Sequence, residues 1–198
     1  LSGEKTPDYC RNMPLLHGLF PAARFVHIIR DGRDTALSML KWANDSKGPG
    51  KWSLWNEDPL ATCALWWRWQ SGTGERDGLG LGSGHYHRVK YEQLVARPEQ
   101  ELAAITTFLG IPYSGAMVRY HEGKTRDKPG LSAKSAWLPP VQNLRDWRKD
   151  MSAEDIGVFE GVAGTLLRAL GYSCSDQPPG AAGRSRVSRC LDWWESEG

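Results

Sequence analysis

Phe25-Val-His-Ile-Ile-Arg30-Asp-Gly-Arg-Asp34-Thr-Ala-Leu-Ser38-Met-Leu-Lys-Trp42 is the stretch that decides the fold. It opens with an apolar, β-branched run over residues 25–29, which is typical of a strand covered on both faces. A polar turn containing Gly32 follows, and the apolar residues after it have spacing that suits a helix. The stretch therefore predicts a strand–turn–helix unit of an α/β protein.

The turn in this unit has the chemistry of an anion site. A helix that starts there offers free backbone N–H groups and the positive end of its dipole. Arg30 adds a planar, permanently charged fork suited to phosphate oxygens, and Ser38 adds a hydroxyl if the turn brings it near Arg30. The alternative is structural: Arg30, Asp31, Arg33 and Asp34 cap the helix and pair with one another. The residues alone leave both interpretations open.

Length and composition narrow the class of protein. A chain of 198 residues is expected to form one domain with a single core. The net charge is +2, and acids and bases are interspersed, so no general affinity for nucleic acid is expected. The four cysteines are widely spaced, which favours free thiols over a disulfide and gives no metal-binding spacing. No apolar run approaches the roughly 20 residues that span a bilayer.

The middle of the chain is expected to consist of a loop, a helix, a glycine-rich connector and a strand. A polar loop over residues 43–59 carries Trp52 and Trp55, which either stack on an acceptor molecule or pin the loop to the core. A helix rich in aromatic residues is expected over residues 60–71. The glycine-rich segment 72–84 is expected to be a flexible connector, because it lacks the ending of a phosphate-binding loop. Residues 86–91 alternate as a strand.

The C-terminal half is expected to be mainly helical. Pro98 at a first helical turn and Gly110 after the last one predict a helix between them. Ser152 has the position of a helix N-cap, and the apolar spacing after it predicts a second helix that stops at Gly171. The composition of residues 174–198 predicts a disordered tail, so the folded domain is expected over residues 1–173.

The stretch FPAARFVHIIRDGRDTALSM, residues 20–39, resembles the 3′-phosphate-binding segment of sulfotransferases that use 3′-phosphoadenosine 5′-phosphosulfate (PAPS). Further segments resemble that family in the same order, so that the similarity covers about residues 3–173. Within that family, these motifs most resemble those of bacterial sulfotransferases that share features with tyrosylprotein sulfotransferases. The segments are Gly3–Pro7, Val89–Leu94, Phe108–Ile111, Leu144–Lys149 and Leu170–Tyr172.

The resemblance implies a fold and a set of site residues. The implied fold is a three-layer α/β structure, like that of P-loop NTPases, with a parallel sheet flanked by helices and with its N-terminal part missing. Arg30 and Ser38 would hold the 3′-phosphate, and Tyr91 would lie near the adenine. Lys5 would contact the transferring sulfuryl group or the leaving phosphate. A loop that closes over the cofactor would supply Ser132, Lys134 and Ser135.

The resemblance also implies a reaction. A hydroxyl or amine acceptor, which is a small molecule, a carbohydrate or a peptide, would take the sulfuryl group from PAPS without a metal. The 5′-phosphosulfate loop and the catalytic Glu or His of the family are not found in these residues, so the chain is expected to be a fragment that is inactive alone. The expected location is the cytoplasm, or the Golgi lumen if a membrane anchor precedes residue 1.

Two other functions remain open at this point. One is a degenerate, non-catalytic domain that binds a nucleotide or another molecule. The other is a nucleotide-dependent phosphotransferase of similar fold, which would need a Gly-Lys-Ser/Thr loop and Mg²⁺-binding acids, with Asp31 and Asp34 as the candidates for those acids.

Overall fold

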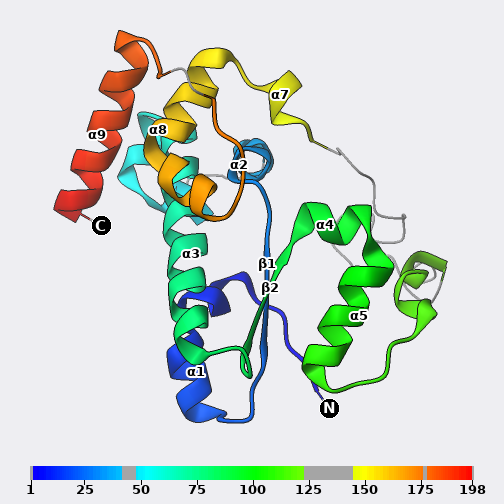
Figure 1. Ribbon diagram of the computed structural model, residues 1–198. Coiled ribbons are helices and arrows are strands. Elements are labelled where there is room, and N and C mark those ends of the chain that lie inside the picture. Colours follow the sequence, from blue (N-terminus) through cyan, green and yellow to red (C-terminus); the bar gives the residue numbers. More distant parts are fainter. Residues whose placement is uncertain (1, 42–47, 123–144, 176–177, 198) are drawn as a thin grey trace. The chain divides into compact units, whose positions relative to one another are not determined.

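A computed structural model describes residues 2–41, 48–122, 145–175 and 178–197 of the chain (Figure 1). The described residues form two compact units. The sheet unit comprises residues 14–29 and 78–144, and the helical unit comprises residues 1–13, 30–77 and 145–198. Residue 30, directly after the first strand, is where the chain leaves the sheet unit for the helical unit.

The sheet unit is built on two parallel strands, β1 (Phe25–Ile29) and β2 (Tyr86–Lys90), which lie side by side with Phe25 opposite Tyr86 and Ile29 opposite Lys90 (Figure 1). The parallel α/β class predicted from the sequence is therefore confirmed. Ile29 and Val89 are buried, but Ile28 is 51% exposed. The expectation that β1 is covered on both faces is thus wrong for the described residues.

Helices α4 (Tyr91–Ala96) and α5 (Pro98–Leu109) follow β2 and contact it. Helix α5 begins with Pro98 in its first turn and ends at Gly110, whose φ of 69° is left-handed and favours glycine. These boundaries are the ones that the sequence predicts. The alternation in the sequence predicts that the strand extends to Tyr91, but Tyr91 is the first residue of α4. Helix α1 (Met13–Leu19) precedes β1.

The long helix α3 (Pro59–Leu81) corrects the expectation of a flexible connector over residues 72–84. Glycine costs a helix only about 1 kcal/mol relative to alanine, and close packing can repay that cost. A Cβ atom at Gly78 would lie 2.2 Å from the ring of Tyr86, so the missing side chain gives the ring its space. Gly78 thus serves packing, whereas a Cβ atom at Gly80 would meet nothing within 4 Å.

The core of the helical unit lies between helices α2 (Gly32–Leu40), α3 and α8 (Ala153–Ala169). Its apolar side chains are almost completely buried; the largest include Leu54, Leu65, Trp67, Phe159 and Leu167. Helix α8 is capped as predicted, with the Ser152 hydroxyl accepting the N–H of Asp155 at 3.1 Å. The shorter elements are the four-residue helix α7 (Trp147–Asp150) and the 3₁₀ helices η1 (Pro7–Arg11), η2 (Gly48–Lys51), η3 (Ser53–Asn56), η4 (Gly115–Met117) and η5 (Tyr120–Glu122).

The C-terminal segment forms helix α9 (Ala181–Glu197), which lies beside α8, whereas its composition predicts disorder (Figure 1). Specific contacts make the difference. The Arg186 guanidinium donates two hydrogen bonds, of 2.7 and 3.0 Å, to the Asp58 carboxylate before α3. Trp193 donates to the Ser53 hydroxyl at 3.0 Å. Composition does not encode such contacts, because the partners lie 128 and 140 residues apart in the sequence.

Trp52 lies at the centre of a cluster of indole rings. Its ring centroid lies between 4.8 and 5.7 Å from those of Trp66 and Trp69 on α3 and of Trp193 and Trp194 on α9. Of the two roles that the sequence leaves open for Trp52, the structure places it in packing. All four cysteines, at positions 10, 63, 174 and 190, are free thiols, as their spacing predicts.

Candidate functional site

The candidate site is the turn between β1 and α2. Asp31 is the N-cap of α2, and its carboxylate accepts the N–H of Arg33 at 3.0 Å. Gly32 is required next, because a Cβ atom there would lie 2.5 Å from the indole of Trp67 and 2.7 Å from the ring of Phe159. Capping and this close approach fix the first turn of α2 against the core of the helical unit.

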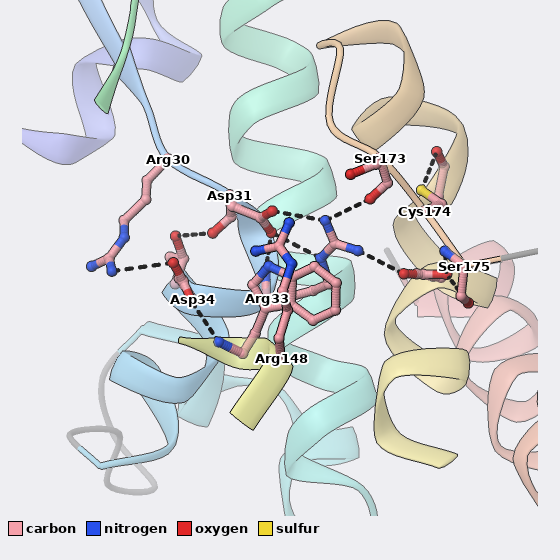
Figure 2. Close-up of polar contacts among 12 residues, drawn as sticks. Arg30, Asp31, Arg33, Asp34, Arg148, Ser173, Cys174 and Ser175 are labelled. Carbon is pink, nitrogen blue, oxygen red and sulfur yellow. Dashed lines mark hydrogen bonds and ion pairs between the residues drawn. The ribbon is translucent and has the colours of Figure 1, made fainter. Parts of the chain in front are cut away.

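Arg30 is held at both its backbone and its side chain. The Trp67 indole N–H donates to the Arg30 carbonyl at 3.2 Å. The Arg30 guanidinium donates through Nη2 to Asp34 Oδ2 at 3.3 Å (Figure 2). The Arg30 side chain keeps 21% of its surface exposed. A partly exposed cation therefore lies directly before the N-terminus of α2.

Asp34 joins Arg30 to a distant part of the chain. Its Oδ1 atom accepts the backbone N–H of Trp147, the first residue of α7, at 3.0 Å. Burial raises the pKa of Asp34, and the Trp147 N–H and the Arg30 charge oppose that rise without cancelling it. The carboxylate is thus a constrained group, held between a cation and a helix start.

Ser38 lies on α2, one helical turn beyond Asp34, and is partly buried. Residues four apart share a helix face, with Cβ atoms about 5–6 Å apart. The Arg30 guanidinium, which contacts Asp34, therefore lies next to the face of α2 that carries Ser38.

Arg33 is the centre of a buried charge network next to the candidate site (Figure 2). Its side chain is fully buried, and it forms a two-pronged contact of 3.0 and 2.7 Å with Asp31. It also donates to Glu160 on α8 at 2.6 Å and to the carbonyl of Ser173 at 2.8 Å. Burial disfavours the Arg33 charge, but the carboxylates of Asp31 and Glu160 outweigh it and raise the Arg33 pKa. This network fixes α2 to α8 and to the segment after it.

The sequence also predicted, as an alternative, that these charged residues cap the helix and pair with one another, and the structure confirms this. Asp31 caps α2, Arg33 pairs with Asp31, and Arg30 pairs with Asp34. The two alternatives are compatible, because the contact of Arg30 differs from that of Arg33. Arg33 is fully buried in a short two-pronged pair, whereas Arg30 is partly exposed and meets Asp34 through one longer contact.

The other predicted site residues are spread over the chain. Lys5 is exposed in the irregular segment before η1, in the helical unit. Tyr91 begins α4 in the sheet unit. Ser132, Lys134 and Ser135 lie outside the described residues. In the described part of the chain, no group of three or more His, Cys, Asp or Glu side chains could hold a metal ion.

Sequence reasoning missed two contacts of this site. The pairing of Glu160 with Arg33 spans 127 residues, and that of Asp34 with Trp147 spans 113. No periodicity or spacing links such positions. The Arg30–Asp34 pair, by contrast, is visible in the sequence as opposite charges four residues apart.

Comparison with known proteins identifies the family. A model of the sulfotransferase family matches residues 2–115, which is more than half of the chain. The chain belongs to the sulfotransferase family. The match includes β1, the turn at Arg30 and all of α2.

Relatives of the chain include protein-tyrosine sulfotransferases. Protein-tyrosine sulfotransferase 2 of Gallus gallus is 30% identical over 182 residues, covering 88% of this chain and 47% of the relative. Protein-tyrosine sulfotransferase A of Caenorhabditis elegans is 26% identical over 189 residues, covering 89% of this chain and 48% of the relative. The chain thus spans about half the length of these two relatives.

A solved structure supports the fold. The sulfotransferase domain from the curacin biosynthetic pathway superimposes with a TM-score of 0.55 at 15% identity, over 95% of this chain and 61% of that domain. An α/β fold in which helices flank a small parallel sheet is therefore shared with a sulfotransferase domain. No described helix of the chain is both long and apolar enough to cross a bilayer.

Proposed function

We propose that this chain carries the 3′-phosphate-binding part of a PAPS-dependent sulfotransferase. The enzyme would transfer a sulfuryl group from PAPS to a hydroxyl or amine acceptor. The observation that carries the proposal is the position of Arg30: a partly exposed guanidinium directly before the N-terminus of α2, next to the helix face of Ser38.

Three features of this site suit a phosphate. The N-terminus of α2 contributes a positive dipole end and its first-turn N–H groups other than that of Arg33, which the Asp31 carboxylate already accepts. Arg30 contributes a planar fork of donors that matches two phosphate oxygens. Ser38 contributes a hydroxyl on the adjacent helix face. A sulfuryl donor with a 3′-phosphate would be oriented by these groups, and orientation with charge stabilisation is the main task in such transfers.

The remaining predicted residues have lesser roles in the proposal. Lys5 would stabilise the negative charge that grows on the leaving phosphate, and Tyr91 would contact the adenine. Ser132, Lys134 and Ser135 would close over the cofactor. The protein-tyrosine sulfotransferases among the relatives make a tyrosine-containing peptide the acceptor to test first.

The test is a calorimetric titration of the 198-residue chain with 3′,5′-bisphosphoadenosine, with 5′-AMP and with ATP–Mg²⁺. The proposal expects a preference for the bisphosphate, because 5′-AMP lacks only the 3′-phosphate. Arg30→Ala removes a hydrogen bond to a charged group, worth about 1.5–3 kcal/mol, and is expected to weaken binding by about 10- to 150-fold. Ser38→Ala is expected to cost about 2- to 10-fold.

Arg76→Ala is the matched control. Arg76 is an arginine of the same unit, its side chain is 73% exposed, and it pairs with its neighbour Asp77 at the surface. Its loss is expected to leave nucleotide binding unchanged. Equal affinity for the bisphosphate and 5′-AMP would refute the proposal. Tighter binding of ATP–Mg²⁺ would favour a phosphotransferase, and no binding of any nucleotide would favour a non-catalytic domain.

A further inference from the structure

Asp34 uses its two carboxylate oxygens for two different partners. Oδ2 accepts from the Arg30 guanidinium at 3.3 Å, and Oδ1 accepts the Trp147 N–H at 3.0 Å (Figure 2). Its side chain is 13% exposed. Because both oxygens have partners, the carboxylate has little freedom to rotate about χ2, and the direction in which it presents Oδ2 to Arg30 is set.

The second partner of Asp34 is itself firmly held. Trp147 is the first residue of α7, whose N-cap Asp146 accepts the N–H of Arg148 at 3.2 Å. The Trp147 ring stacks on the buried Arg33 guanidinium, with the carbon of the guanidinium 3.6 Å from the ring centroid. The guanidinium of Arg148 lies 4.4 Å from the same centroid. Asp34 is therefore anchored to the buried charge network on one side and contacts Arg30 on the other.

The Arg30–Asp34 contact is weaker than the buried Arg33–Asp31 pair, but it still restricts the conformation of the Arg30 side chain. A strong arginine–carboxylate pair is two-pronged with distances of about 2.7–2.9 Å, as Arg33 approximates with Asp31. The contact of Arg30 with Asp34 is 3.3 Å long and uses Nη2. Such a contact limits the rotamers of the arginine while holding its charge less tightly than the buried pair does.

We propose that Asp34 is a positioning residue that orients the Arg30 guanidinium for the 3′-phosphate, an inference that rests on the proposed function. An arginine without such a contact loses the conformational entropy of its long side chain when it binds a ligand, and this loss lowers the affinity. With Asp34 in place, part of that ordering has already occurred in the free protein. Asp34 does not touch the nucleotide, and its effect on binding passes through Arg30.

The experiment compares two substitutions of Asp34 by titration with 3′,5′-bisphosphoadenosine. Asp34→Asn keeps the size of the side chain and an oxygen for the Trp147 N–H, but it removes the charge; it is expected to weaken binding by about 3- to 20-fold. Asp34→Glu keeps the charge and is expected to bind better than Asp34→Asn. A merely structural role predicts the opposite order, because asparagine is isosteric with aspartate and glutamate is not.

Asp155→Asn is the matched control, because Asp155 makes the same kind of single 3.3 Å contact with another arginine, Arg186. It is expected to change the affinity less than twofold. Wild-type affinity or tighter binding in Asp34→Asn would overturn the inference, as would weaker binding in Asp34→Glu than in Asp34→Asn.

The inference and the proposed function fail in different ways. If Arg30→Ala weakens binding and Asp34→Asn does not, only the positioning role of Asp34 is refuted. If Arg30→Ala itself leaves binding unchanged, the proposed phosphate site is refuted, and the role of Asp34 is refuted with it. Thermal unfolding of each variant shows whether it has folded, and Asp34→Glu provides the second variant if Asp34→Asn does not fold.

Discussion

Replacing Arg33 by methionine tests whether the buried charge network holds the helical unit together. Methionine is long and flexible enough to occupy much of the vacated space, so the change removes charge more than volume. It leaves the carboxylates of Asp31 and Glu160, whose side chains are 8% and 6% exposed, without their shared cation. Both acids would then face burial with an uncompensated charge or would have to bind a proton.

The expected cost follows from that arrangement. Removing one partner of a buried ion pair destabilises a protein by about 3–5 kcal/mol, and Arg33 serves two carboxylates, which places the expectation near the upper end. Such a loss is a large share of the about 5–15 kcal/mol that holds a domain folded. With a denaturant slope of about 2 kcal/mol per molar urea, the unfolding midpoint is expected to fall by about 2 M.

The assay is urea unfolding followed by far-UV circular dichroism, on wild type, Arg33→Met, Glu160→Gln and the double variant. Glu160→Gln removes one of the two carboxylates that Arg33→Met leaves unpaired, so the double variant is expected to lose less than the sum of the single losses. A loss below about 1 kcal/mol in Arg33→Met, or strict additivity in the double variant, would refute the reasoning.

Two further predictions concern α9 and α2. Burial alone would raise the pKa of Asp58, but the hydrogen bonds and charge of Arg186 outweigh it and lower the pKa. The Asp58–Arg186 pair therefore stabilises the fold above the unfolded pKa of about 3.9, and this stabilisation is lost as the pH falls through the lower folded pKa. Arg186→Met is therefore expected to destabilise the protein at pH 7 and to cost much less at pH 2.5 in urea unfolding; an equal cost at both pH values would contradict this sign. Gly32→Ala places a Cβ atom 2.5 Å from Trp67 and is expected to cost about 1–3 kcal/mol in thermal unfolding, whereas Gly18→Ala, with nothing within 4 Å, is its control and is expected to cost nothing. Equal melting temperatures for the two glycine variants would be inconsistent with the packing at α2.

The sequence predicted the elements whose signals are local. The apolar run of β1, the proline and glycine that bound α5, and the Ser152 cap of α8 each act within a few residues, and the structure confirms them. The family resemblance at residues 20–39 was also local, and the family match includes that stretch.

The sequence failed where distant contacts decide the structure. Gly78 lies in a helix where the ring of Tyr86 occupies the space beside it, and α9 forms where Arg186 meets Asp58. At the candidate site, the Arg30–Asp34 spacing was readable, but the anchoring of Asp34 to Trp147 was not. Each missed feature depends on which segments meet in three dimensions.

The indole cluster around Trp52 has an optical consequence. Its ring centroids lie within 5.7 Å of that of Trp52, so the excited states of these chromophores are expected to mix and to give the cluster its own near-ultraviolet dichroic signature. Two of the rings come from α9 and two from α3, so separation of the two helices would remove the contributions of Trp193 and Trp194 and change that signature, while Trp66 and Trp69 would stay paired on α3. The chain thus contains a label-free spectroscopic reporter of whether its C-terminal helix is docked.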